Sequence, residues 1–198
     1  ILLGASSATA AGIPGGAELL TAALEVTDRF WVDGDGAGVE AFDREFRDAE
    51  HYRGQNANMH LTEAYLAAYE VTGHEYILER ALRIAHRIAD RAAAGQDGAW
   101  RLPEHFDASW RELPEHNHDE PRHPFRPYGS QPGHWLEWAK LLLQIRGLGV
   151  GEPWLLDAAR HLFDGAFRDA WASNGGFCYT VDWDGTPVVP ERFFWEIA

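Results

Sequence analysis

The feature that most constrains the fold of this chain is a series of segments with apolar residues spaced three and four apart. Short and long connections join these segments alternately. Such spacing is typical of amphipathic helices. It predicts five helices, over residues 15–32, 57–73, 74–95, 132–147 and 153–171. The second and third meet at Gly73 with almost no linker, which indicates an antiparallel helical hairpin.

Two connections, over 33–56 and 96–131, are long and irregular. Connections of this length are unusual in compact domains unless they carry function. If they join the same ends of successive hairpins, they form one face of a helical toroid, and we expect the site there. A short β-hairpin around Asp184-Gly185 is predicted for the same face. The predicted fold class is all-α, a toroid of helical hairpins with long loops.

Both ends of the chain have the pattern of interrupted helices. Residues 1–12, ILLGASSATAAG, fit the end of a helix better than a targeting segment, because no basic region precedes the apolar stretch. Residues 191–198, ERFFWEIA, fit a helix that has just begun. We therefore expect a single helical barrel domain over residues 1–198, truncated at both ends.

The charge of the chain limits its partners. Its 31 acidic and 17 basic residues give a formal net charge of −14 at pH 7. Nucleic acids and acidic membrane surfaces need clustered Lys and Arg, so neither is expected as a partner. No apolar run reaches the length of a membrane span. The single cysteine, Cys178, fits a reducing compartment, so we expect a cytoplasmic protein that binds a small neutral molecule.

Two helix starts carry a histidine followed three residues later by a glutamate. His134 and Glu137 begin the fourth helix. His60 and Glu63 begin the second, where Asn56 precedes them by one turn. Positions three and four apart share a helix face. A carboxylate beside a histidine can orient its ring for proton exchange near neutral pH.

Such a pair suits proton transfer between adjacent carbons of a sugar. His134 would remove the proton from carbon 2, and Arg126 is a candidate donor to the oxygens of the enediol intermediate. The same residues have structural interpretations. Glu137 would stabilise the positive end of the helix dipole, and Trp135 and Trp138 have the spacing of core residues.

Two other chemistries compete with proton transfer. The stretch EHNHDEPRH, residues 115–123, is dense in groups that bind divalent metals, but its spacing matches no zinc motif. A solvated loop is the preferred interpretation, and no metal site is predicted. Glycosidases need two carboxyl groups facing one bond, and no loop pair stands out among Glu104, Asp107, Glu112 and Asp119. No nucleotide-binding motif is present, and no cofactor is predicted.

Four stretches resemble the N-acylglucosamine 2-epimerase superfamily, particularly its aldose–ketose isomerase branch of mannose and sulfoquinovose isomerases. They are YRGQNANMHLTEAYLAAYEVTG (52–73), RLPEHFDASW (101–110), FRPYGSQPGHWLEWAKLLL (125–143) and GGFCYTVDWDG (175–185). The N-A-N-M-H and P-G-H-x-x-E-W motifs are the most specific. The likeness runs over nearly the whole chain. It implies an (α/α)6 barrel, here partial because members of the family are longer.

The resemblance also implies a reaction and roles for residues. The reaction is metal-independent transfer of a proton between carbons 1 and 2 through a cis-enediol. By motif match His134 is the general acid/base and Glu137 its partner, while His60 assists ring opening or proton movement and Asn56 contacts the sugar. Three further residues lie in loops that line the pocket in relatives: Phe125, Arg126 and Glu104. The second catalytic histidine of the family has no counterpart here.

The sequence therefore predicts an aldose–ketose isomerase, with D-mannose and D-fructose as the first choice of sugar. Sulfoquinovose isomerisation and 2-epimerisation of N-acylglucosamine are alternatives within the family. The alternative from another class is a non-catalytic sugar-binding or assembly module. Because a partial barrel would expose apolar helix faces, pairing of copies into a homo-oligomer is also considered.

Overall fold

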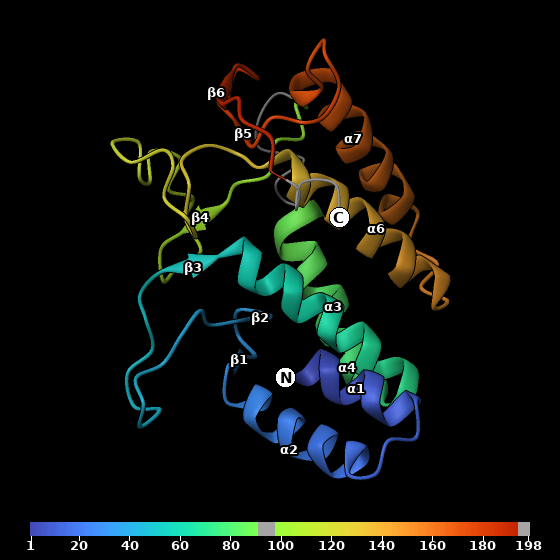
Figure 1. Cartoon of the computed structure of the whole chain (residues 1–198). Helices are drawn as coiled ribbons and strands as arrows, with labels where there is room; N and C mark the ends of the chain where they lie inside the picture. Colours follow the sequence, from blue (N-terminus) through green and yellow to red (C-terminus); the bar gives the residue numbers. More distant parts are fainter. Residues whose placement is uncertain (91–97, 194–198) are drawn as a thin grey trace. The chain divides into compact units, whose positions relative to one another are not determined.

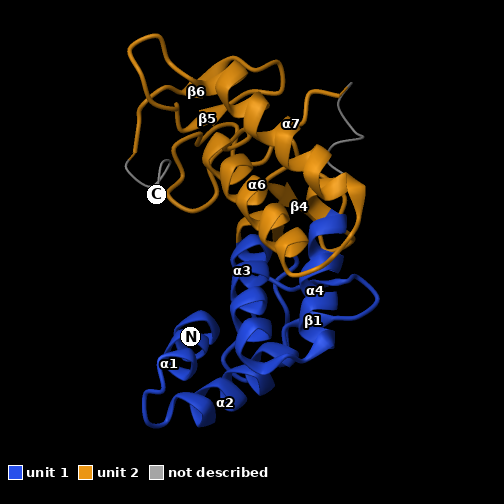
Figure 2. Cartoon of the chain, turned by 90° about the vertical axis from the view of Figure 1, so that its right-hand side faces the viewer, with its two compact units in different colours: residues 1–51, 57–87 blue, residues 52–56, 88–198 orange. Residues whose placement is uncertain are grey.

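The computed structural model describes residues 1–90 and 98–193 (Figure 1). The chain divides into two compact units. Unit 1 contains residues 1–51 and 57–87, and unit 2 contains residues 52–56 and 88–198 (Figure 2). No described helix is long and apolar enough to cross a membrane.

Two packed helices open unit 1: α1 (Leu2–Ala10) and α2 (Gly16–Asp28) lie against one another (Figure 1). Their contact requires a glycine at position 16, where a Cβ atom would lie 2.9 Å from the carbonyl carbon of Ala8. Residues on the inner faces are buried: Leu2, Ala5, Leu20, Ala23 and Leu24. The predicted helical character of residues 1–12 is thus confirmed over most of that stretch.

A small hairpin follows that the sequence pattern did not predict. Strands β1 (Trp31–Val32) and β2 (Ala37–Gly38) pair antiparallel. β2 lies in the connection expected to be irregular, but β1 occupies the end of the stretch 15–32 predicted as helix, because α2 ends at Asp28. The side chain of Asn58 holds the hairpin, since it accepts from the Gly38 amide at 2.8 Å and donates to the Gly38 carbonyl at 3.0 Å. Two-residue strands are too short to show an alternating pattern.

The predicted central hairpin is formed by α3 (Gln55–Thr72) and α4 (Glu75–Ala85). Gly73 ends α3 with a φ of +66°, a left-handed conformation that glycine adopts without strain. The predicted apolar stripe of the third helix is buried throughout: Ile77, Ala81, Ile84, Ala85 and Ile88. After α4 the chain makes a π-helical turn, η1 (His86–Asp90). The predicted remainder of that helix, 91–95, lies outside the described residues.

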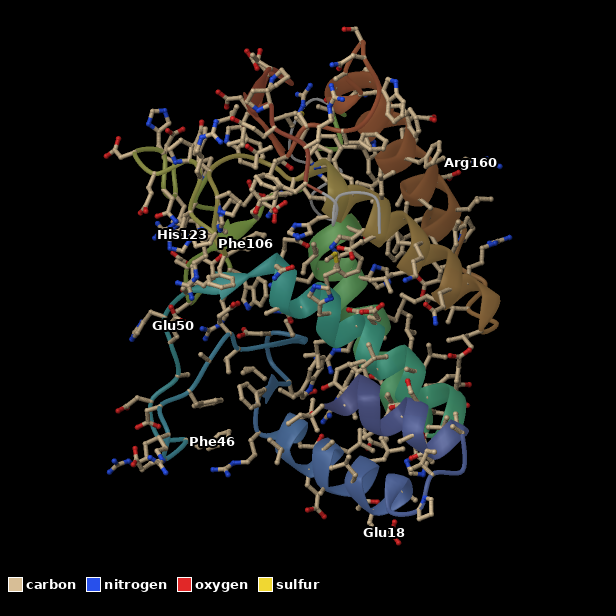
Figure 3. The ribbon with its side chains drawn as sticks, in the orientation of Figure 1. Glu18, Phe46, Glu50, Phe106, His123 and Arg160 are labelled. Atoms are coloured by element: carbon tan, nitrogen blue, oxygen red, sulfur yellow. The ribbon has the colours of Figure 1, made fainter. Side chains whose placement is uncertain are left out.

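Unit 2 is built on α6 (Pro132–Gly147) and α7 (Pro153–Ala170), which pack side by side (Figure 1). Both helices begin with a proline, a residue that fits the first turn of a helix. Trp135 and Trp138 are fully buried, which confirms their interpretation as core residues. Charged side chains such as Arg160 on α7, and Glu18 on α2 of unit 1, point away from the helices that carry them (Figure 3).

Two short antiparallel pairs of strands complete unit 2. β3 (Arg53–Gly54) pairs with β4 (His105–Phe106), so that Gly54 lies opposite His105. β5 (Thr180–Val181) pairs with β6 (Pro187–Val189), which confirms the β-hairpin predicted around Asp184-Gly185. Residues 191–193 are not helical. The rest of the predicted final helix, 194–198, falls outside the described residues.

Candidate active site

A buried group of polar side chains lies where β3, β4 and α6 meet in unit 2. Gln55 follows β3, Glu104 precedes β4, and His134 lies in the first turn of α6. The pairing of β3 with β4 continues one step further, since the Gln55 amide donates to the Glu104 carbonyl at 3.0 Å. The short ladder therefore places Gln55 beside Glu104, although 48 residues separate them in the sequence.

The carboxylate of Glu104 accepts four hydrogen bonds. Its Oε1 accepts from the backbone amide of Gln131 at 2.9 Å. Its Oε2 accepts from the side-chain amides of Gln55 (2.8 Å) and Gln131 (3.1 Å) and from His134 Nδ1 (2.8 Å). The residue is 3% exposed. Because Gln131 immediately precedes α6, the negative charge also lies at the positive end of that helix.

These contacts keep Glu104 ionised. Burial on its own would raise its pKa, but the charge and hydrogen bond of His134 and the hydrogen bond from Gln55 outweigh it. The pKa of Glu104 is lowered from its ordinary value of 4.5. A carboxylate that accepts several hydrogen bonds is expected to behave in this way.

An ionised Glu104 fixes the protonation of the His134 ring. A carboxylate can only accept, so Nδ1 must carry the hydrogen in the 2.8 Å bond between them. In the neutral ring the lone pair is then on Nε2, the nitrogen that can take a proton. The His134 side chain is 13% exposed. The arrangement is a histidine base oriented by a buried carboxylate.

A second histidine, His105, lies next to Glu104 in the chain and is held in a neutral form. Its Nε2 donates to the Pro127 carbonyl at 2.8 Å, so Nδ1 accepts from the Tyr52 hydroxyl at 2.7 Å. Burial lowers its pKa from the ordinary 6.5. The guanidinium of Arg126 lies 3.9 Å from the centre of the Tyr52 ring, a cation–π contact. His105 and Tyr52 therefore hold the segment that carries Arg126.

The structure brings together some of the predicted site residues. Glu104 and His134 are bonded directly, and Arg126 is joined to the same region through Tyr52. Asn56 is exposed at the start of α3, next to Gln55. Phe125 is 81% exposed, beside Arg126.

The two glutamates expected at the site differ in their contacts. The carboxylate that orients His134 at Nδ1 is Glu104, whereas Glu137 is half-buried and forms no hydrogen bond or ion pair with the described residues. The His134 ring is instead bonded to Glu104, which precedes β4. Glu104, expected in a loop that lines the pocket, is buried, and its oxygens accept from protein donors.

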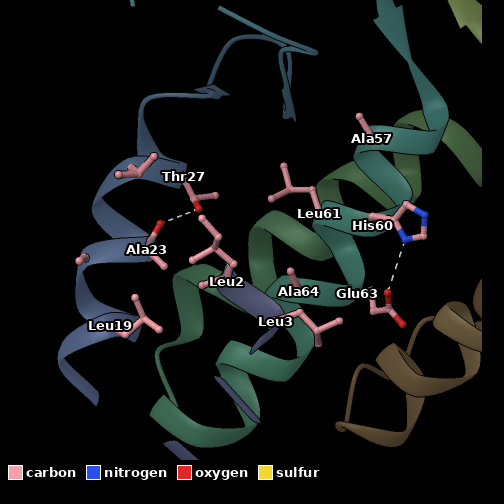
Figure 4. Close-up of a pocket in the computed structure, with 13 residues that line it drawn as sticks. Leu2, Leu3, Leu19, Ala23, Thr27, Ala57, His60, Leu61, Glu63 and Ala64 are labelled. Carbon is pink, nitrogen blue, oxygen red and sulfur yellow. Dashed lines mark hydrogen bonds and ion pairs between the residues drawn. The ribbon is translucent and has the colours of Figure 1, made fainter. Parts of the chain in front are cut away.

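His60 belongs to unit 1. Its Nδ1 lies 3.5 Å from Glu63 Oε2, so this His-x-x-Glu pair does form, at a position where the His60 side chain is 54% exposed. The pair borders a groove of about 750 Å³ whose other walls are mostly apolar, with Leu2, Leu19 and Leu61 among them (Figure 4). His134 does not line this groove.

The side chains of the histidine-rich loop 115–123 contact neighbouring residues of unit 2. His123 lies among the loops of unit 2 (Figure 3), where its Nδ1 accepts from the Arg126 amide at 3.0 Å. His116 packs on the rings of Tyr52 and His105, and His118 packs on Tyr128. Within the described ranges, no three His, Cys, Asp or Glu side chains are placed to hold a metal ion.

Fold and site together define a helical-hairpin protein with a buried carboxylate–histidine pair. The sequence profile of the N-acylglucosamine 2-epimerase (GlcNAc 2-epimerase) family matches residues 1–198, so the chain belongs to this family. The predicted family resemblance is confirmed.

Three similar proteins carry a more specific name. A D-mannose isomerase of Thermobifida fusca is 48% identical over 202 residues, which cover 100% of this chain and 49% of that protein. A D-mannose isomerase of Pseudomonas cannabina pv. alisalensis is 43% identical, with coverage of 98% and 49%. A crystal structure of D-mannose isomerase matches 98% of this chain and 50% of its own with a TM-score of 0.92 and 34% identity.

The chain thus spans about half the length of the curated relatives it matches. The match to the solved structure confirms the predicted fold class. The chain is mostly helical, with short strands, and corresponds to part of an (α/α)6 barrel.

Proposed function

We propose that the protein is an aldose–ketose isomerase that interconverts D-mannose and D-fructose. The observation that carries the proposal is the bond from His134 Nδ1 to the buried Glu104, which places the lone pair of the neutral ring on Nε2. Two relatives at 48% and 43% identity, both called D-mannose isomerases, support the choice of sugar.

The proposed reaction moves one proton between adjacent carbons. His134 Nε2 takes the proton from carbon 2 of the open-chain aldose, and the electron pair forms a double bond between carbons 1 and 2. The carbonyl oxygen at carbon 1 takes up a proton, which gives the cis-enediol. Return of a proton to carbon 1 and loss of the proton from the oxygen on carbon 2 give the ketose. The imidazolium formed in the first step is stabilised by the charge of Glu104.

Other residues are proposed to bind the sugar. Arg126 is a donor for the enediol oxygens, and its place beside Tyr52 and His105 supports a fixed position for it. Asn56 and Phe125 expose their side chains and are proposed as sugar contacts. Glu137 and His60 remain proposed participants, with Glu137 close in sequence to His134.

The test is isotope exchange catalysed by the protein. D-mannose is incubated with enzyme in heavy water, and fructose formation and deuterium at carbon 1 are followed by NMR. We expect fructose that carries deuterium at carbon 1, and we expect His134→Gln to abolish both signals. His161→Gln is the matched control, because His161 is an exposed residue of α7.

Other outcomes separate the alternatives. Exchange at carbon 2 without accumulation of a ketose would instead indicate a 2-epimerase. Turnover of sulfoquinovose in preference to mannose would reassign the substrate. Near wild-type exchange in His134→Gln would refute the role of His134.

A further inference from the structure

The side-chain amide of Gln55 has a defined orientation. Its Oε1 accepts from the indole nitrogen of Trp138 at 2.7 Å. An indole N–H can only donate, so the oxygen of the amide must face Trp138 and the nitrogen must face the other way. Gln55 and Trp138 are both fully buried, so water cannot replace either partner.

With that orientation, Gln55 holds Glu104 at two points. Its backbone amide donates to the Glu104 carbonyl at 3.0 Å, and its Nε2 donates to Glu104 Oε2 at 2.8 Å. The first bond fixes the main chain of Glu104 and the second fixes its carboxylate. Gln55 is thus a rigid link from the core tryptophan of α6 to the carboxylate.

The same amide completes a triangle with the site histidine. Gln55 Nε2 and His134 Nδ1 each lie 2.8 Å from Glu104 Oε2, and the amide is next to the ring nitrogen. Only a side chain of this length that donates toward Glu104 and accepts from Trp138 serves all these contacts.

We infer that Gln55 is a positioning residue, whose indole-locked amide holds Glu104 where it accepts the Nδ1 proton of His134 and so selects the ring tautomer. Its value for catalysis rests on the proposed function, but its effect on the tautomer does not. Gln55 acts through Glu104 and is not proposed to touch the sugar.

The experiment measures the tautomer of His134 directly. Long-range ¹H–¹⁵N NMR of the chain separates a protonated ring nitrogen from one with a lone pair, and His134→Gln assigns the signals. In the unaltered chain at neutral pH we expect Nδ1 to be protonated and Nε2 to carry the lone pair. In Gln55→Met, which keeps the volume but cannot donate, we expect the two nitrogen shifts to move toward each other as the tautomers mix.

The matched control is Gln144→Met, the same change at a half-buried position of α6 whose side chain forms no hydrogen bond with the described residues. It should leave the His134 shifts unchanged. A folded Gln55→Met with wild-type His134 shifts would overturn the inference, and so would an Nε2-protonated ring in the unaltered chain.

Amide exchange in the unaltered chain covers the case in which Gln55→Met does not fold. The side-chain N–H groups of Gln55 should exchange with water at least about tenfold more slowly than those of Gln144, because a bonded amide must open first. Equal rates would overturn the inference. Failure of the isomerase proposal would appear only in the sugar assay, so the two results are distinguishable.

Discussion

Replacing Glu104 with glutamine tests whether the buried carboxylate is the centre of the site. Glu104→Gln preserves shape but turns one acceptor oxygen into a donor. The least costly placement points the new N–H₂ group at the backbone amide of Gln131, which loses one bond and sets two donors face to face. The three bonds to the other oxygen survive as bonds to a neutral acceptor.

The magnitude follows from those bonds. A bond to a charged group is worth about 1.5–3 kcal/mol and a neutral one about 0.5–1.5 kcal/mol, so three weakened bonds lose about 3 kcal/mol. A buried unsatisfied donor adds about 1–3 kcal/mol. Relief from burying a charge offsets part of this cost, so we expect a net loss of about 3 kcal/mol, the lower end for a broken buried ion pair. For a chain of this size that lowers Tm by roughly 6–12 °C.

Thermal unfolding followed by circular dichroism is the assay, and Glu137→Gln is the matched control. Glu137 forms no bond with the described residues, so its replacement should change stability by less than about 0.5 kcal/mol. The stabilisation from Glu104 is full above its ordinary pKa of 4.5 and is lost as pH falls through its lowered folded value. The two variants should therefore converge in acid. Equal Tm values for both variants at pH 7, or a larger loss in Glu137→Gln, would refute the reasoning.

Three further predictions follow from other contacts. Burial lowers the pKa of His105, so its neutral form contributes stability above about pH 6.5. That stability is lost as the pH falls through the lowered pKa of His105 in the folded protein. Tm measured by calorimetry should therefore decline below pH 6.5, before the carboxylates titrate. Gly129→Ala should lower the free energy of unfolding in urea by at least about 2 kcal/mol, since φ is +90° and the new Cβ would lie 2.5 Å from a carbonyl oxygen of β5. Gly147→Ala is the control and should be near neutral, because the space around Gly147 is open. Asp169→Asn should cost about 3–5 kcal/mol in the same assay, because it removes a 7% exposed carboxylate from two arginines at 2.8 and 2.7 Å.

The helical part of the fold could be predicted because its determinants are local. Apolar spacing predicted the position of α6, and Gly73 marked the end of α3. The hairpin around Asp184-Gly185 was equally visible, because its turn residues lie between its strands. In each of these cases the signal and the structure occupy the same short window of sequence.

The site was only half predictable, because its bonds join residues far apart in the sequence. Nothing near His134 indicates that Glu104, thirty residues earlier, is its partner. That contact depends on the pairing of β3 with β4, two strands of two residues each. Gln55 and His105 were missed for the same reason. The available signal was their position beside Asn56 and Glu104, inside stretches already chosen for their likeness to the family.

The most direct test of the carboxylate–histidine pair is the rate of deuterium transfer from heavy water into D-mannose and D-fructose in Glu104→Gln. Without the buried charge that holds the Nδ1 proton, the rate constant should fall at least about 100-fold. Glu18→Gln, an exposed change on α2, should keep the wild-type rate. A Glu104→Gln protein that is folded and exchanges within a few-fold of wild type would contradict the account.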